Sequence, residues 1–572
     1  MTNAEAERQI TVETEVYELG LDLEAGRIRL TVQGLNRTVF DSTNPLLLMP
    51  QFTGKRTEVG GVEVRESRST READRYLILR APVSGPFSGW IENRLYCLRE
   101  RIVCTGRYLV ETDHSVAHWE LLGEGSRLGM PSVHAYIGEP KTYLNGKVLD
   151  TDDLEVSTAS HNYDNWNCLP RLLFTDGNVT AGVGGTSIAH DYGLEVKTDE
   201  ERCVEYARFN YGGAAAPHPG DGGRVQRGPR LQIQFTIGKT HNESHRLFTE
   251  AMIDDGIIPP QKYRPEHEPW RRPWYCTWAD QVLLARTLEA EDDWTGQKMS
   301  NHVLDEDLVM RAARRIREWD LNVGTFVIDA GWQDKRGDWN PIEEKFPDMP
   351  ALVTRLHEMG FKVHFWWSPF QVEPGAKVLE RDGFTYKLPG VDEYALDYTN
   401  PAVREYIGAK VDKWFSAGPG GWDIDGLKQD WQCERVQPVK DPIDRDWRGE
   451  ERCLYKMQKM MNEIAARHKH AYVISQGPLN PHFNNLGFHA GIGELFEDDQ
   501  EFLIRSKPSL RTLLPGWWLK SHTTYFPETA GQHVRVTRGL GKNSIPEIGT
   551  VLPDNVTDEQ MQAIREALKS PS

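Results

Sequence analysis

Residues 325–332 read Thr-Phe-Val-Ile-Asp-Ala-Gly-Trp, a short apolar run that is followed by an aspartate, an alanine, a glycine and a tryptophan. Before this run, apolar residues recur every four positions, which predicts a helix near Asp305–Trp319. After it, the pattern predicts a helix over Met349–Met359 and then a strand over Lys362–Trp366. A strand, a helix and a second strand in this order are typical of a parallel sheet with helical crossovers.

The same alternation of strands and helices runs from Trp274 to the end of the chain, over roughly 300 residues. That length favours an eight-fold (β/α)8 TIM-type barrel over an open sheet. A last helix opens at Thr557, which has capping-box spacing to Gln560. The other expected elements are strands at Trp274–Trp278, up to Lys428, at Tyr472–Ser475 and near Glu494–Phe496, and helices at Val403–Phe415 and Glu450–His468.

The first half of the chain has a different periodicity. Apolar and polar residues alternate in several segments, for example over residues 27–32 and 231–237, which predicts a large antiparallel β-sandwich. A Gly- and Pro-rich stretch, Tyr211–Arg230, is expected to form one long loop. The chain is therefore predicted to be a multidomain β plus α/β protein. We expect a β-sandwich over 1–255, a linker with five prolines over 256–273 and a catalytic barrel over 274–572.

The composition excludes several classes of function. Lys and Arg number 67 and Asp and Glu number 85, so the net charge is −18, which argues against a nucleic-acid partner. No apolar run reaches about 18 residues, so no membrane span is expected. Seven cysteines without a CxxC pair, and no apolar leader, predict a cytoplasmic protein. The sequence leaves open whether the chain forms a homo-oligomer.

Polar residues gather where the predicted barrel strands end, which is where barrel enzymes place their active sites. No nucleophile elbow, phosphate loop, dinucleotide fingerprint or HExxH motif occurs there. Carboxylates, one lysine and indoles remain, and this set suits glycoside cleavage between two carboxyl groups. An aspartate at such a position also serves as a helix N-cap in many barrels. The four strand ends are Asp329-Ala330-Gly331-Trp332, Trp366-Trp367-Ser368-Pro369, Lys428-Gln429-Asp430-Trp431 and Glu497-Asp498-Asp499.

Lys428 and Asp430 are two residues apart, so both side chains lie on one face of a strand. A cation there keeps a carboxylate ionised, as a nucleophile requires. The alternatives are a surface lysine and, for Trp332 and Trp366, ordinary core packing. The acidic loop 440–446 lacks the spacing and glycine of a calcium-binding loop, so no metal is expected there. No cofactor is expected either.

At these residues the chain resembles glycoside hydrolase family 36, the α-galactosidase-like family of clan D. The resemblance covers the predicted barrel, and its motifs occur in the family's order. The matching segments are Thr277-Trp278, 326–332, Gly337-Asp338-Trp339, Lys345-Phe346-Pro347, Ala395-Leu396-Asp397, Lys428-Gln429-Asp430 and 495–499, followed by Arg505, Pro515 and His522.

The resemblance implies an exo-acting, retaining α-glycosidase acting on a glycoside or oligosaccharide. It implies Asp430 as the nucleophile and Asp498 as the acid/base, with Asp499 as the rival acid/base. Such a pair predicts carboxyl groups about 5–5.5 Å apart. The implied substrate-binding residues are Asp329 and Lys428 for ring hydroxyls, Trp278, Trp332 and Trp366 for the pocket wall, and Asp499 and Trp431 beside the catalytic pair.

The departures from the family pattern concern the sugar. Ala330 stands where the family has a second aspartate, and Val391, Glu393 and Ser368 replace other polar positions. Because polar contacts discriminate strongly between substrates, these changes indicate galactose or a related or modified glycone. Three alternatives remain: a transglycosylase of the raffinose-synthase type, an α-glucosidase-like enzyme of family 31, and a non-catalytic carbohydrate-binding protein.

Overall fold

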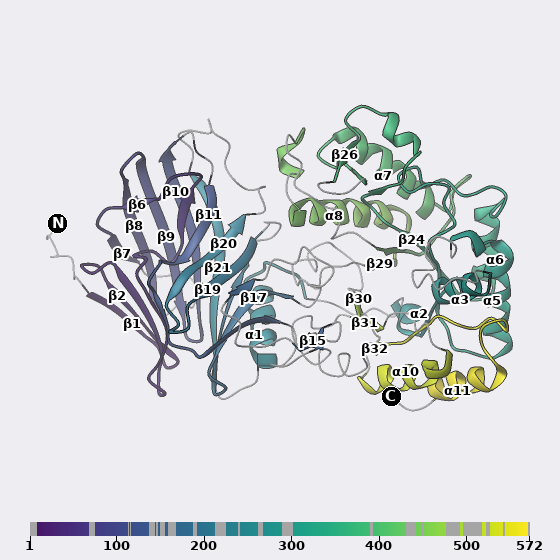
Figure 1. Cartoon of the computed structure of the whole chain (residues 1–572), viewed down its shortest axis with the longest axis horizontal. Coiled ribbons are helices and arrows are strands. Elements are labelled where there is room, and N and C mark those ends of the chain that lie inside the picture. Colours follow the sequence, from purple (N-terminus) through teal and green to yellow (C-terminus); the bar gives the residue numbers. More distant parts are fainter. Residues whose placement is uncertain are drawn as a thin grey trace.

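The computed structural model describes most of both halves of the chain (Figure 1). The described residues are 9–67, 75–112, 114, 116–136, 143–144, 147–148, 155–157, 168–186, 192–211, 225–237, 241–260, 267–288, 301–388, 393–430, 442–447, 450–475, 492–495, 518–521, 527–541 and 544–569.

Antiparallel sheets form the N-terminal half. One has the order β1-β2-β3-β4-β12, with β1 Gln9–Glu13, β2 Tyr17–Asp22, β3 Arg27–Val32, β4 Arg37–Ser42 and β12 Arg127–Leu128. A second has the order β16-β19-β20-β11-β5, with β16 Glu155–Ser157, β19 Tyr192–Thr198, β20 Val204–Tyr211, β11 Val116–Leu122 and β5 Met49–Phe52. The hairpin strands β14 Tyr143–Leu144 and β15 Lys147–Val148 pair with each other.

The largest sheet runs β13-β17-β18-β21-β10-β9-β8-β6, and β7 also pairs with β8. Its strands are β6 Glu58–Val59, β7 Glu63–Ser67, β8 Arg75–Ser84, β9 Ser88–Leu98, β10 Arg101–Glu111, β13 Ser132–Tyr136, β17 Cys168–Thr175, β18 Val179–Gly185 and β21 Gln226–Ile237. Apolar residues from all three sheets form one buried cluster. In β3, Ile28, Leu30 and Val32 are buried and their neighbours are more exposed, so the two-residue period produces the expected buried face.

The predicted loop over Tyr211–Arg230 is wrong at its end, because β21 already begins at Gln226. There β21 pairs with β10 across a register shift between Thr105 and Arg107. Gly228 and Gly106 face the ring of Trp119, and a Cβ on Gly228 would come within 2.1 Å of it. The glycine therefore serves close packing inside a strand rather than loop flexibility.

The C-terminal half is a parallel β/α domain. Six strands run in the order β29-β28-β24-β23-β22-β33, and β30-β31-β32 form a second parallel sheet. The strands are β22 Trp274–Cys276, β23 Thr325–Ile328, β24 Lys362–Trp367, β28 Gly426–Gln429, β29 Val473–Ser475, β30 Ile492–Leu495, β31 Trp518–Ser521, β32 Ser544–Ile545 and β33 Glu547–Ile548. A separate antiparallel sheet, β25 Gln371–Val372, β27 Tyr394–Leu396 and β26 Thr385–Lys387, lies between β24 and the next helix.

The strand order agrees with the predicted barrel in part. Pro546 alone separates β32, which pairs with β31, from β33, which pairs with β22, so this segment joins the two sheets. Within the residues that the structure describes, the hydrogen-bonded ladder between β29 and β30 is missing, although these strands are in contact. The parallel β/α architecture is confirmed, and complete closure by hydrogen bonds is not.

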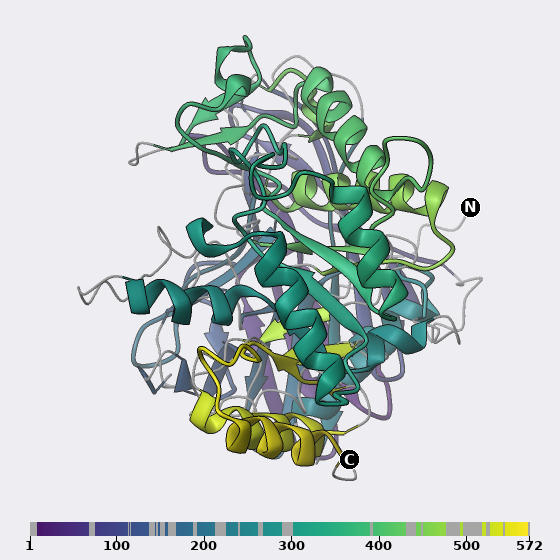
Figure 2. The same ribbon diagram turned by 90° about the vertical axis from the view of Figure 1, so that its right-hand side faces the viewer.

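Helices cover this domain on its outer side, and Figure 2 shows several of them in front of the sandwich. They are α3 Trp278–Leu288, α5 Glu306–Glu318, α6 Met349–Glu358, α7 Pro401–Phe415, α8 Glu450–His468, α10 Pro527–Gly539 and α11 Asp558–Lys569, with short 3-10 turns at Lys377–Glu380 and Arg445–Trp447. The predicted capping box exists, because Thr557 N donates to Gln560 Oε1 and Gln560 N donates to Thr557 Oγ1. No described helix is long and apolar enough to cross a membrane.

Two helices, α1 and α2, come between the two halves in the sequence. Helix α1 His241–Asp254 packs on β21 and β18 of the sandwich, and its Phe248 and Met252 belong to the buried cluster of the β/α domain. Helix α2 Glu268–Arg271 lies inside the predicted linker. Its Trp270 is fully buried and donates from Nε1 to His364 Nε2 at 2.9 Å, so this end of the linker packs into the β/α domain.

Candidate active site

Strands β22, β23, β24 and β28 bring the predicted site residues together. Their ladders are parallel, with Cys276 opposite Val327, Ile328 opposite Phe365 and Trp366 opposite Lys428. The carboxyl ends therefore meet at one edge, as a barrel site requires. The prediction that β22 extends to Trp278 is wrong. The strand ends at Cys276, because the Thr277 carbonyl accepts from Gln281 N and helix α3 begins.

A buried ion pair lies at this edge. Lys428 Nζ is 2.9 Å from Asp329 Oδ2, and both side chains are 3% exposed. The other oxygen, Asp329 Oδ1, accepts from Ala330 N at 2.8 Å. Lys428 is therefore a buried lysine and not a surface lysine. Its ammonium group forms an ion pair with the carboxylate of Asp329.

Cys276, which the sequence analysis did not select, completes this cluster. Its Sγ donates to Asp329 Oδ2 at 3.0 Å and lies 3.8 Å from Lys428 Nζ. Burial, together with the nearby charge of Asp329, raises the pKa of the thiol well above its usual range, so the thiol stays protonated. The sequence feature that could have identified Cys276 is its spacing of two residues from Trp274, which places both side chains on the same face of β22.

Asp430 lies directly after β28 at the same edge. Its backbone N–H donates to the carbonyl of Trp367 at 2.9 Å, which extends the ladder between β24 and β28 by one residue. Its carboxylate Oδ2 accepts from the indole Nε1 of Trp366 at 2.8 Å. Asp430 is half-buried, whereas Trp366 is buried. This aspartate therefore combines an oriented carboxylate with partial exposure.

The three predicted wall tryptophans have different surroundings. Trp332 is fully buried, and its ring packs edge-on against Phe365, Trp414 and Trp422. It belongs to the core between the sheet and α7, so the structure contradicts its assignment to the pocket wall. Trp366 touches Asp430, and Trp278 is half-buried at the start of α3.

The remaining predicted residues, Asp498, Asp499 and Trp431, lie outside the described residues. The expected separation between the carboxyl groups of Asp430 and Asp498 stays a prediction for the same reason. Arg505, Pro515 and His522 of the family motifs also lie outside the described part of the chain.

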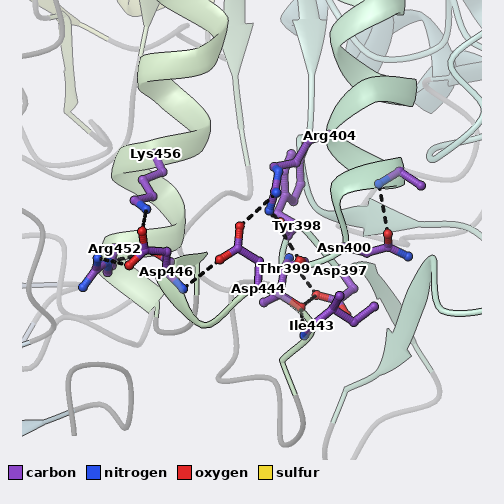
Figure 3. A network of polar contacts seen from close by, with 11 residues as sticks. Asp397, Tyr398, Thr399, Asn400, Arg404, Ile443, Asp444, Asp446, Arg452 and Lys456 are labelled. Carbon is purple, nitrogen blue, oxygen red and sulfur yellow. Dashed lines mark hydrogen bonds and ion pairs between the residues drawn. The ribbon is translucent and has the colours of Figure 1, made fainter. Parts of the chain in front are cut away.

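Part of the loop that follows Asp430 is anchored to neighbouring helices (Figure 3). Asp444 pairs with Arg404 of α7 at 3.0 Å, and its N–H donates to the Thr399 carbonyl. Asp446 pairs with Arg452 of α8 at 2.8 Å and with Lys456 at 3.5 Å. These acids neutralise arginines and lysines, and the described residues contain no group of side chains suited to a metal ion.

Comparison with known proteins gives the class of this domain. Residues 294–487 match the model of the glycosyl hydrolases family 31 TIM-barrel domain. The myogenesis-regulating glycosidase of Mus musculus is 27% identical over 192 residues, which are 31% of this chain and 24% of that protein. The A type blood α-D-galactosamine galactosaminidase of Flavonifractor plautii is 30% identical over 126 residues, 19% of this chain and 12% of that protein. The chain thus spans a quarter or less of these relatives.

Solved structures extend the likeness to nearly the whole chain. A variant of the family 36 α-galactosidase AgaA from Geobacillus stearothermophilus, solved with raffinose, has a TM-score of 0.60 and 12% identity, and the match covers 98% of this chain and 85% of that one. The β/α domain is a glycoside hydrolase domain. The resemblance to family 36 is confirmed in fold, whereas the matching family model is that of family 31; both families belong to clan D.

Proposed function

We propose that the protein is an exo-acting, retaining α-glycosidase, with its catalytic function in a (β/α)8 barrel over residues 274–572. The observation that carries this proposal is the half-buried Asp430, held by an indole N–H beside the buried Lys428–Asp329 pair. A site with a carboxylate nucleophile and a fixed cation is chemically suited to cleave a glycosidic bond. The matched family model and the fold of the α-galactosidases support the same chemistry.

In the proposed first step, an oxygen of Asp430 donates an electron pair to the anomeric carbon. The bond from that carbon to the leaving oxygen breaks, and the leaving oxygen takes the proton of Asp498. In the second step, water gives a proton to Asp498 while its oxygen attacks the anomeric carbon, and Asp430 departs as a carboxylate. Two inversions give a product with retained configuration.

Lys428 and Asp329 are proposed to bind hydroxyl groups of the terminal sugar. Their ion pair at 2.9 Å holds two charged hydrogen-bonding groups together at the strand ends. Ala330 brings a methyl group where the family 36 pattern has a carboxylate, so one polar contact to the sugar is absent. We therefore propose galactose or a related, modified glycone, and the galactosamine in the name of the Flavonifractor plautii relative supports a modified sugar.

The test is release of p-nitrophenol from aryl α-glycosides carrying galactose, glucose, N-acetylgalactosamine or arabinose, with Asp430→Asn assayed in parallel. Asp307→Asn, a substitution of an exposed aspartate in α5, is the matched control. We expect turnover of one glycoside by wild type and the control but not by Asp430→Asn. Unchanged turnover in Asp430→Asn would contradict the proposal.

A further inference from the structure

The indole of Trp366 lies directly against the proposed nucleophile. Its Nε1 is 2.8 Å from Asp430 Oδ2, and Trp366 is 3% exposed. An indole N–H only donates and does not titrate, so it holds a carboxylate without exchanging a proton with it. The geometry points to Trp366 as a positioning residue that binds Oδ2 of Asp430 and directs Oδ1 to the anomeric carbon. This inference rests on the proposed function.

The donor itself is fixed from three sides. The backbone of Trp366 lies opposite Lys428 in the parallel ladder of β24 and β28. Its carbonyl accepts from Nε1 of the buried Trp332 at 2.9 Å. The ring of Trp339 lies 6.1 Å from the ring of Trp366, so it packs against its face at an angle. The N–H direction is therefore set by the fold before substrate binds, as preorganised catalysis requires.

The bond affects both proposed steps. When Oδ1 joins the anomeric carbon, Oδ2 becomes the carbonyl oxygen of an ester and still accepts from the indole. When water displaces the sugar, the electron pair returns to Asp430 and Oδ2 becomes part of an anion again. A hydrogen bond to an anion is stronger than one to a neutral carbonyl. The indole therefore stabilises Asp430 both as the free nucleophile and as the leaving group of the second step.

Among the described residues, three charged or titratable side chains of this edge lie on other strands. Asp329 on β23, Lys428 on β28 and Cys276 on β22 bond to one another. We expect a substitution of the Trp366 side chain to leave this cluster in place. A change in the acid limb of the pH profile can then be assigned to the carboxylate that loses its donor.

The experiment removes the N–H in two ways. Trp366→Phe deletes the donor together with part of the ring, and 3-benzothienylalanine at position 366 replaces the N–H by sulfur in a ring of nearly the same shape. The matched control is Trp367→Phe, because Trp367 is the next residue of β24 and its buried Nε1 has no hydrogen-bond partner in the described part of the chain. Each enzyme is assayed for kcat and for the pH profile of kcat/KM on the aryl glycoside that wild type hydrolyses.

We expect both position-366 enzymes to lose about tenfold in kcat and to show an acid limb at higher pH, because the protonated carboxyl is favoured without the donor. Wild-type values in both enzymes would overturn the inference, as would the same changes in Trp367→Phe. Should Trp366→Phe not fold, the benzothienylalanine enzyme gives the same two readouts. Failure of a fluorinated glycosyl donor to label Asp430 in wild type would instead refute the proposed function.

Discussion

An aspartate flanks strand β28 at each end, and the two side chains differ in burial and in their hydrogen-bond partners. Asp425 precedes the strand and is 2% exposed; its carboxylate binds His357 Nε2 at 2.7 Å, Lys362 Nζ at 2.9 Å and Val363 N at 3.0 Å. Asp430 follows the strand and is half-buried, and one donor to its Oδ2 is the neutral indole of Trp366. The two carboxylates are five positions apart in the chain, yet their surroundings differ.

Asp425 is suited to a structural role and Asp430 to a chemical one. Burial alone pushes the pKa of Asp425 upward, but the hydrogen bond from His357 and the charges of Lys362 and Lys469 outweigh burial and hold it well below its usual range. At 2% exposure the carboxylate of Asp425 is out of reach of a substrate, and its bonds to cationic side chains make it a structural anchor. Asp430 is half-buried, so its carboxylate is partly exposed at the carboxyl end of the strand, where a nucleophile can meet its substrate.

The largest expected effect is on activity at the carboxyl end of β28. Asp430→Asn should lower kcat at least about 10³-fold, because an amide cannot form the glycosyl ester. Its free energy of unfolding should stay close to wild type. Steady-state kinetics and urea unfolding of the same preparation check both statements, and a stability loss as large as that of an Asp425 variant would remove the contrast between the two ends.

The second effect is on stability at the amino end. Asp425→Ala should lower the free energy of unfolding by about 3–5 kcal/mol, because it removes a buried carboxylate from its partly exposed cationic partners and from the Val363 N–H. Urea unfolding at neutral pH measures this loss. Enzyme that is still folded in buffer should keep a wild-type KM, because Asp425 lies at the opposite end of the strand from the site.

The same carboxylate predicts a pH dependence. The folded-state pKa of Asp425 is lowered, so its contribution to stability is fully present above the unfolded value near 4 and is lost as pH falls below it. Wild type should therefore lose stability on acidification through this range more steeply than Asp425→Asn. Equal slopes in pH-dependent urea unfolding would show that Asp425 does not carry the effect.

A smaller effect is expected at the buried pair of the site. Lys428→Met should lower the free energy of unfolding by about 2–3 kcal/mol, since Asp329 keeps the Cys276 thiol and the Ala330 N–H as donors. The kcat/KM should also fall, because a hydroxyl-binding cation is removed. Asp329→Asn combined with Lys428→Met should recover part of the stability and none of the activity, as thermal unfolding and kinetics would show.

The smallest effect is expected in the loop that follows Asp430. Asp444→Ala removes a partly exposed ion pair to Arg404, so the free energy of unfolding should change by about 0.2–1 kcal/mol. The change should shrink further in high salt. Urea unfolding at low and high ionic strength measures both changes. A loss above about 2 kcal/mol would mean that the Asp444–Arg404 pair stabilises the protein as strongly as a buried ion pair does.

Local sequence signals predicted much of the β/α domain. The bounds of β23 and α8 were predicted to the residue, because a compact apolar run and a long amphipathic stretch define them. Helix α10 was not predicted. Gly531 interrupts its pattern, yet a Cβ there would lie 3.1 Å from Ala563 of α11, so the glycine permits close packing of two helices. Such a requirement is tertiary and leaves no periodic signal.

The sequence predicts which residue types lie at the candidate site better than it predicts the contacts between them. The two-residue spacing correctly placed Lys428 and Asp430 at one strand end. The bonds from Trp366 to Asp430 and from Cys276 to Asp329 depend on strand register and side-chain torsions, which the sequence does not contain. The prediction that Trp332 lines the pocket wall is wrong, because this side chain is fully buried in the core. The sequence alone does not distinguish a tryptophan that packs in a core from one that faces a sugar.

The most direct test of the central claim is covalent trapping. Wild-type enzyme is incubated with the 5-fluoro glycosyl fluoride of the glycone that it hydrolyses, digested, and examined by mass spectrometry. We expect one added glycosyl group, attached to Asp430. A label on another carboxylate, or turnover of the aryl glycoside without any trapped intermediate, would contradict it.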